Sequence, residues 1–266
     1  MFTSRREKTL TEYGLAHSDF RKELDRILTA AKSENVLLRV IGALAFNMHC
    51  PKYGFLQETL GRAYTDIDFA SYINQATGIS TLFANLGYLE DFMVSRLFGR
   101  GRMLFHNNTT NKLHCDVFFD KLEFCHNIPF KNRLEVDEPT VPLAELLLEK
   151  MQIVKINEKD VIDSVMLLCE HEIGNTDKEI INGQRIAQLC AAEWGLWRTV
   201  TMNLDRVAGY TSSIEKLPEA DKENVHSKIA KLLRMIEEEP KSTGWRLRAR
   251  IGDKRKWYRD VEELSR

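Results

Sequence analysis

Two aspartates separated by one apolar residue, Asp66-Ile67-Asp68, offer the clearest candidate chemistry in the chain. If this segment is a β-strand, its side chains alternate, so both carboxylates point to one side and Ile67 to the other. Their Cα atoms then lie roughly 6.6 Å apart. Carboxylates this close repel each other unless a cation lies between them, and hard divalent cations take oxygen ligands. The spacing predicts a metal site, although Asp-x-Asp also occurs in turns and at solvated strand edges.

A strand, a glycine and a helix precede the aspartates. Residues 36–41 are a short apolar, β-branched run that stops at Gly42, which predicts a buried strand and a turn. A helix can then run from Ala43 to His49. The N–H groups at a helix N-terminus suit a phosphate, so Gly42 and Ala43 are candidates for binding one. A phosphate site followed by paired metal carboxylates is typical of phosphoryl or nucleotidyl transfer.

A third acid, Asp116, lies within a predicted apolar strand at residues 112–120. Burying an unpaired carboxylate is costly, so an acid within this apolar strand is expected to have a specific partner and not to be an ordinary solvated charge. The alternative is an acid at a strand end that pairs with a lysine or arginine. Alternation places His114, Asp116 and Phe118 on one face of the strand. Asp120 is expected in the loop that follows.

Lys150 lies in the middle of a very apolar helix, predicted for residues 143–156. Its ammonium could face nucleotide phosphates as a compact point charge. The alternative is a lysine that buries its stem and extends its charge into solvent.

Together, Gly42-Ala43 and Asp66-Ile67-Asp68 resemble the signature of the nucleotidyltransferase superfamily, which includes DNA polymerase β and the aminoglycoside nucleotidyltransferases. Within it, Arg62-x-x-Thr65-Asp66-Ile67-Asp68-Phe69 most resembles the AbiEii/MenA-type toxins and related uncharacterised nucleotidyltransferases. The resemblance covers roughly residues 36–163. The family usually has Gly-Gly or Gly-Ser where this chain has Gly42-Ala43, so here no serine hydroxyl can contact a triphosphate.

The resemblance implies an α+β fold, in which a nucleotidyltransferase-like mixed β-sheet flanked by helices is followed by a C-terminal helical bundle. It implies transfer of an NMP from an NTP to a hydroxyl acceptor, either RNA, such as a tRNA end, or a small molecule. Two Mg²⁺ ions would be held by Asp66, Asp68 and Asp116. Asp116 could also take the proton from the acceptor hydroxyl.

The resemblance also implies a nucleotide site and a role for Lys150 in catalysis. Arg62 and Lys150 would neutralise charge on the triphosphate. Asp163 would orient the lysine or the bound base. The implied nucleotide-binding residues are Gly42, Ala43, Arg62, Thr65, Lys150 and Asp163.

Two other functions stay open. The chain could be a nucleotide- or RNA-binding module that has kept the fold and lost turnover, which Ala43 favours. It could also have a non-nucleotide role in a toxin–antitoxin pair, with an antitoxin partner, which only a neighbouring gene could suggest.

Residues 241–259 form a basic segment that carries eight lysines and arginines against one aspartate, Asp253. Trp245, Trp257 and Tyr258 are interleaved. Basic residues with aromatics suit phosphate contacts and base stacking, so this segment is a candidate RNA surface. The alternative is a solvated tail whose aromatic side chains pack on the helical half.

Composition limits the remaining possibilities. The 266 residues are 43% hydrophobic and 29% charged, with a formal net charge of −1, so no global charge bias indicates nucleic acid. No apolar stretch approaches the ~18 residues of a membrane helix, and no signal peptide is evident. Five cysteines without Cys-x-x-Cys spacing favour reduced thiols and a cytoplasmic protein. Adjacent His-Cys pairs, as at His49-Cys50, have poor geometry for a structural zinc.

The pattern changes near Pro139 and Pro142, which predicts an α/β domain at 1–138 and a helical domain at 139–266. In the first, we expect helices at 18–33 and 74–86, a strand at 66–72, a hairpin of 88–97 with 103–107, and one or two strands in 124–137. In the second, we expect helices at 143–156, 158–172, 178–194, 197–207, 218–238 and 255–264.

Overall fold

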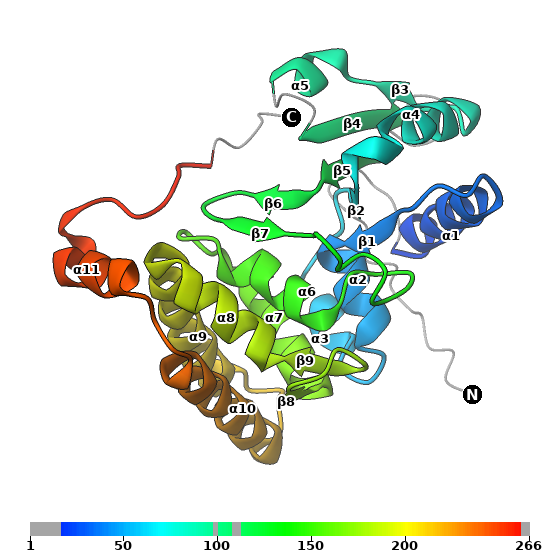
Figure 1. The fold of residues 1–266 in the computed structure, drawn as a ribbon. Coiled ribbons are helices and arrows are strands. Elements are labelled where there is room, and N and C mark those ends of the chain that lie inside the picture. The colour runs from blue at the N-terminus through cyan, green and yellow to red at the C-terminus, as the bar shows by residue number, and fades with distance from the viewer. Residues whose placement is uncertain (1–16, 98–100, 108–112, 262–266) are drawn as a thin grey trace, which may run out of the picture.

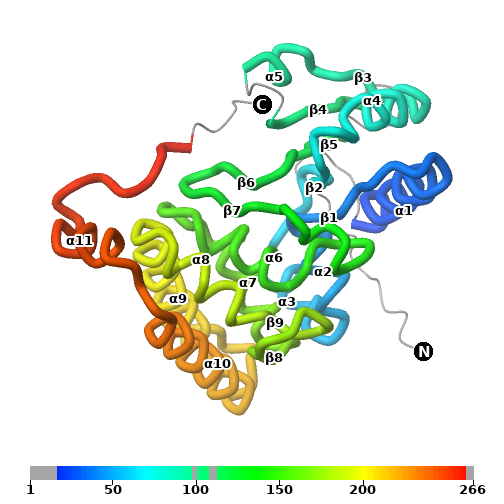
Figure 2. The backbone as a smooth tube through the Cα atoms, viewed as in Figure 1, coloured from blue at the N-terminus to red at the C-terminus, as the bar shows by residue number. Residues whose placement is uncertain are grey.

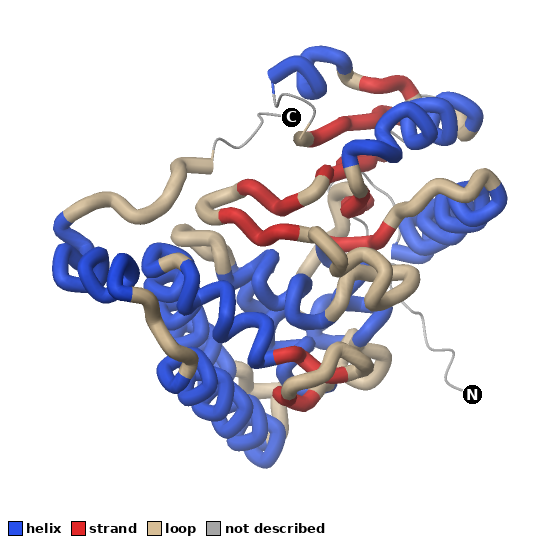
Figure 3. The backbone as a smooth tube through the Cα atoms, viewed as in Figure 1, coloured by secondary structure: helices blue, strands red, loops and turns tan. Residues whose placement is uncertain are grey.

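The computed structural model describes residues 17–97, 101–107 and 113–261. The strands of the central sheet all lie in the first half of the chain, together with helices, and the second half is mainly helical. Figure 3 colours the helices blue and the strands red. The protein is therefore mixed α+β, with a mixed sheet and helices, which confirms the coarse fold class. Among the described residues, no helix combines the length and apolarity needed to cross a membrane.

The central sheet has the strand order β1-β2-β5-β4-β3. Its strands are β1 (Arg39–Ile41), β2 (Ile67–Ser71), β3 (Leu89–Glu90), β4 (Arg102–Asn107) and β5 (Leu113–Phe119). Only β2 and β5 are parallel, and their register places Asp68 beside Asp116. The antiparallel pair β1–β2 places Ile41 beside Asp68.

Helices α1 (His17–Ser33) and α4 (Ala76–Asn85) cover the apolar face of this sheet (Figure 1). Phe83 of α4 stacks on Phe105 of β4 with ring centroids 4.2 Å apart, and its edge meets Phe69 of β2. On α1, Phe20 and Leu24 are fully buried. Since side chains alternate along β2 and β5, this apolar packing turns Asp68 and Asp116 toward the opposite face.

On the opposite side, α2 (Gly42–His49) packs against β1 and β2, and α6 (Leu143–Met151) and α7 (Glu158–Glu170) pack against α2. All nine residues of α6 are buried, including Glu149 and Lys150. The bundle continues with α8 (Gly183–Ala192), α9 (Trp194–Ser213) and α10 (Glu219–Glu238). One continuous apolar core joins the sheet to this bundle, while the division into two domains stays a prediction.

The smaller elements are α3 (Phe55–Thr59), the 3₁₀ turns η1 (Ile73–Gln75) and η2 (Gly252–Lys254), and the antiparallel pair β6 (Lys121–Glu123) and β7 (Asn127–Pro129). A parallel pair, β8 (Glu172–Gly174) and β9 (Ile180–Asn182), lies within the helical half. The helix expected at 178–194 therefore begins only at Gly183, where the Asn182 side chain accepts from the backbone N–H of Arg185.

The expected hairpin at 88–97 and 103–107 is wrong in its first strand. Only Leu89 and Glu90 pair with β4, and α5 (Phe92–Leu97) follows as a helix. Asp91 explains the change, because its Oδ1 accepts from the N–H groups of Met93 and Val94 and so caps the helix. Residues 98–100 of the expected turn lie outside the described residues.

The last helix is displaced from the expected range 255–264. Helix α11 (Thr243–Ile251) is capped by Ser242, whose Oγ accepts from the N–H of Trp245. It ends at Gly252, which has φ +59°. Residues 255–261 are not helical, and 262–264 lie outside the described residues. In Figure 2 the chain leaves α11 and returns toward β4 and α5.

We expect Phe83→Ala to lower the free energy of unfolding by about 3–5 kcal/mol, because the aromatic cluster under the sheet loses its central ring. Urea denaturation should show a lower midpoint with an unchanged slope. Phe92→Ala is the control, since Phe92 is 68% exposed and its loss should change stability by less than about 0.5 kcal/mol. Equal effects of the two changes would contradict this packing.

Candidate metal centre and nucleotide site

The carboxylates of Asp66, Asp68 and Asp116 lie together on the face of the sheet turned toward α2. One oxygen from each lies within 4.8 Å of the others. Asp68 and Asp116 are adjacent because β2 and β5 pair in parallel, and Asp66 directly precedes β2. Asp116 is fully buried, whereas Asp66 and Asp68 are half-buried. An all-oxygen donor set partly open to solvent fits a hard divalent cation such as Mg²⁺.

Gly42 packs directly against this group. It has φ +71°, and a Cβ at this position would lie 2.6 Å from Oδ2 of Asp68. Glycine is therefore required twice, for the left-handed backbone and for the close approach to the carboxylate. The register of β1 with β2 explains the approach, because Ile41, the preceding residue, pairs with Asp68.

The Gly42 N–H does not match the expected phosphate contact. It donates to Oε2 of the buried Glu149 at 3.0 Å. Ala43 is half-buried, and its carbonyl accepts from Nε2 of Gln57 at 3.2 Å. The strand-glycine-helix unit is thus present, but Glu149 engages the first N–H of its helix.

Asp116 has a partner that the sequence analysis did not name. Nε of Arg102 donates to its Oδ1 at 2.8 Å, and the Arg102 guanidinium also lies over the Phe118 ring, 5.0 Å from the centroid. The arginine pairing of the alternative is therefore present, but Asp116 lies within β5 and not at a strand end, and it also belongs to the carboxylate group. Arg102 could not be identified from sequence, because its position opposite Phe118 depends on the register of β4 with β5.

Lys150 is buried among carboxylates. Its Nζ lies 2.7 Å from Oε1 of Glu149, 3.3 Å from Oδ1 of Asp160 and 3.8 Å from Oδ2 of Asp163. Burial alone would lower the pKa of Lys150, but these carboxylates outweigh it and hold the pKa above its ordinary value. The side chain is only 8% exposed, so the alternative of a charge extended into solvent is wrong.

Arg62 also contacts Asp163. Its Nε and Nη2 each lie 3.4 Å from Oδ2 of Asp163, and Nε2 of Gln57 donates to Oδ1 at 2.8 Å. Burial opposes the charge of Arg62, but Asp163, Asp160 and Asp66 raise its pKa. The hydroxyl of Thr65 donates to Oδ1 of Asp66 at 3.0 Å.

These contacts connect the predicted site residues. Asp68 touches Gly42, Gly42 donates to Glu149, and Glu149 binds Lys150. The sequence analysis did not identify Glu149. It could have done so, because Glu149, like Lys150, is a charged residue within a very apolar helix. The arrangement can hold a divalent cation next to a buried, charge-compensated network.

The basic segment 241–259 uses two of its aromatic side chains for packing. Nε1 of Trp245 donates to the carbonyl of Cys190, and Nε1 of Trp257 donates to Oγ1 of Thr199. Arg248 lies over the Trp194 ring, 4.2 Å from its centroid. These contacts match the packing alternative, so stacking of RNA bases on the two tryptophans is not supported.

A cavity of about 380 Å³ lies between the sheet and the end of this segment. Its walls include Phe118 and Phe124, together with Arg102 and Arg259. Two hydrogen bonds fix Arg259 there. Its backbone N–H donates to the carbonyl of Cys125, and its Nη2 donates to Oδ1 of Asn127 at 2.8 Å. Arg102, which lines the cavity, also binds Asp116 and so links the cavity wall to the carboxylate group.

Comparison with protein-family models, with curated proteins and with solved structures gave no match for this chain.

The five cysteines are all free and buried.

We expect Gly42→Ala to weaken Mg²⁺ binding about tenfold or more, because the new Cβ displaces a carboxylate ligand. Gly61→Ala is a matched control. Gly61 has φ +72°, but its Cβ would meet nothing within 4 Å. Both changes should cost roughly 1–2 kcal/mol of backbone strain. Calorimetric titration with Mg²⁺ should separate them, and equal affinities would argue against Asp68 as a ligand.

We expect Lys150→Met to lower the free energy of unfolding by about 3–5 kcal/mol, because it leaves buried carboxylates without their cation. The exposed Lys155 supplies the control, and Lys155→Met should change stability by less than about 0.5 kcal/mol. Urea denaturation of both variants gives the comparison. If Lys150→Met is as stable as the parent, the ammonium does not compensate this network.

Proposed function

We propose that this protein is a metal-dependent nucleotidyltransferase that moves an NMP from an NTP to a hydroxyl acceptor. The observation that carries the proposal is the convergence of Asp66, Asp68 and Asp116, with Gly42 packed against Asp68. Three carboxylate oxygens are a donor set for Mg²⁺, and a glycine at this contact leaves room for a ligand close to the backbone.

Mg²⁺ held by Asp66, Asp68 and Asp116 would supply charge stabilisation at the transferring phosphoryl group. The chain's own residues would orient the reactants. Arg102 fixes the carboxylate of Asp116 through Nε. We assign Asp116 as the group that accepts the proton of the acceptor hydroxyl, because it is the fully buried member of the three and its partner Arg102 lines the cavity.

For the nucleotide, Arg62 is the favoured cation. It interacts electrostatically with Asp66 as well as Asp163, so it lies between the metal carboxylates and the buried network. Thr65 orients Asp66 through its hydroxyl. We propose that Lys150 and Asp163 act first as positioning residues, since Lys150 holds the Glu149 that binds Gly42. A contact of Lys150 with phosphate would require its ammonium to turn from Glu149.

The cavity lined by Arg102 suits a small acceptor or the nucleotide base. Its volume of about 380 Å³ lies in the range of small-molecule sites. Phe118 and Phe124 supply apolar walls, and Arg259 supplies a cation at the rim. RNA as acceptor remains a proposal that rests on the exposed Arg246 and Arg250 of α11. An antitoxin partner likewise remains a prediction.

A non-catalytic nucleotide-binding module is the second candidate. The observation that favours it is the Gly42 N–H, which donates to Glu149. With Ala43 in the following position, the helix offers fewer groups to a triphosphate than a Gly-Ser pair would. Such a protein would bind NTP with Mg²⁺ and transfer nothing.

The test is transfer of label from each NTP, labelled at the α-phosphate, to an RNA pool and to a metabolite pool in the presence of Mg²⁺. We expect Asp66→Asn and Asp68→Asn each to lower the rate by at least about 10³-fold, because metal stabilisation of the transition state amounts to several kcal/mol. Asp120→Asn is the control, since Asp120 lies just beyond β5 and bonds the N–H of Ile73 instead.

Transfer that survives in Asp66→Asn and Asp68→Asn would exclude the assigned metal site. Binding of NTP by the parent without any transfer would favour the non-catalytic module. Labelling confined to one pool would identify the class of acceptor.

A further inference from the structure

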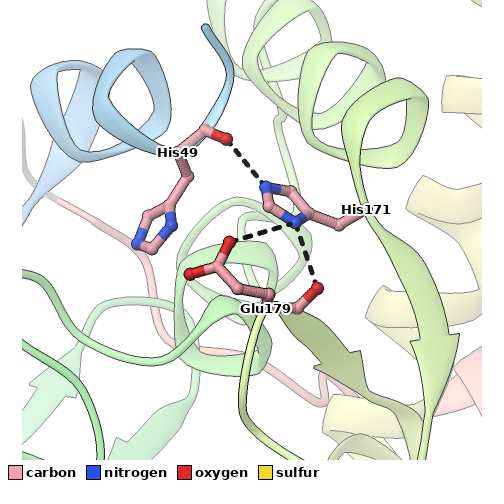
Figure 4. A group of neighbouring side chains, drawn as sticks. All are labelled: His49, His171 and Glu179. Carbon is pink, nitrogen blue, oxygen red and sulfur yellow. Dashed lines mark hydrogen bonds and ion pairs between the residues drawn. The ribbon is translucent and has the colours of Figure 1, made fainter.

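A second group of ligand-type side chains lies away from the three aspartates. His49 at the end of α2, His171 just after α7 and Glu179 before β9 converge, with one ligand atom from each within 4.8 Å of the others. Figure 4 shows the Glu179 carboxylate between the two imidazole rings. The ring centroids of the two histidines are 5.8 Å apart.

Each imidazole is oriented by a contact through Nε2. Nε2 of His171 donates to the carbonyl of His49 at 2.8 Å, and Nε2 of His49 lies 2.5 Å from Oγ1 of Thr140. Histidines that bind metals are commonly held in this way, with one nitrogen bonded to a carbonyl or other polar group and the other directed at the metal. Both Nδ1 atoms are therefore the candidate ligand atoms.

A further carboxylate lies near this group. Oδ2 of Asp137 lies 3.8 Å from Nε2 of His49, on the nitrogen that also contacts Thr140.

Glu179 completes the group from the solvent side. Its side chain is 68% exposed, so it can move, and its Oε2 lies 3.9 Å from Nδ1 of His171. Its backbone has φ +54°, a left-handed conformation that is uncommon for a non-glycine residue, and its carbonyl lies 3.2 Å from the same Nδ1. Residues in such sparsely populated backbone conformations cluster at active sites and ligand-binding positions.

We propose that Nδ1 of His49, Nδ1 of His171 and the carboxylate of Glu179 bind a transition-metal dication of the Zn²⁺ class, with a solvent molecule as the remaining ligand. Two imidazoles and one carboxylate are a donor set for Zn²⁺, whereas Mg²⁺ and Ca²⁺ take oxygen. Tetrahedral Zn²⁺ needs ligand atoms roughly 3.3 Å apart, so a small inward movement of the exposed Glu179 would complete the site.

The position of this group gives the metal a structural consequence. His49 ends the helix that begins at Gly42, and His171 follows the helix that carries Asp160 and Asp163. A metal at this point would join α2 to the end of α7. The proposal does not rest on the proposed function, because none of its ligands belongs to the aspartate group.

The test is calorimetric titration of metal-free protein with Zn²⁺, repeated in two buffers of different ionisation enthalpy. We expect one equivalent to bind at the same stoichiometry in both buffers, because the three ligand atoms converge on a single position. Glu179→Gln and His171→Gln should each weaken binding by more than about 100-fold, since each removes a direct ligand. Thr140→Val should weaken it about 10–100-fold, because it removes only the partner of His49.

The matched control is His114→Gln, which removes a histidine from the other close pair, where Nδ1 of His106 and Nδ1 of His114 are 2.6 Å apart. Its Zn²⁺ affinity should equal that of the parent. Glu179 is exposed, so Glu179→Gln should fold even if His171→Gln does not. Failure of the parent to bind Zn²⁺, unchanged binding in Glu179→Gln, or loss of binding in His114→Gln would each overturn the assignment.

Discussion

The proposed active site depends on two contacts made by the buried carboxylate of Glu149. One oxygen accepts from the N–H of Gly42, and the other binds the ammonium of Lys150. Without a cation, this carboxylate would be costly at such a depth, and without Glu149 the helix that begins at Gly42 would lose a buried partner. Lys150, itself compensated by Asp160 and Asp163, thus stabilises the turn that lets Gly42 approach Asp68.

Local patterns in the sequence were enough to predict β1, β2 and β5, and the acids in or beside the last two. The alternation in Asp66-Ile67-Asp68 and the apolar frame of Asp116 reflect burial on one face of a sheet, which is a property of neighbouring residues. Gly42 could be predicted for the same reason. The apolar run stops where the chain turns into α2, and the φ of +71° at Gly42 is the backbone conformation of that turn.

Contacts between distant segments could not be predicted. Arg102 reaches Asp116 only because of the β4–β5 register, and His49 meets His171 across 122 residues. The prediction also failed at Asp91, where helix capping competes with continuation of the strand. Its side chain caps α5 and ends a strand that the apolar pattern alone would have continued. The tryptophans of segment 241–259 could stack on RNA bases or pack on the helical half, and their contacts with α8 and α9 decide between the two.

The parallel pairing of β2 with β5 has a consequence for the order of folding. Asp68 and Asp116 are far apart in the chain, so they approach each other only after a long loop has closed, and closing it costs conformational entropy. Their mutual repulsion therefore belongs to the native state and is absent from the unfolded ensemble. A cation that binds these carboxylates would act on the native state alone, and its concentration would set the stability of the sheet by mass action. The chemistry of the site and the persistence of the fold would then respond to the same ion.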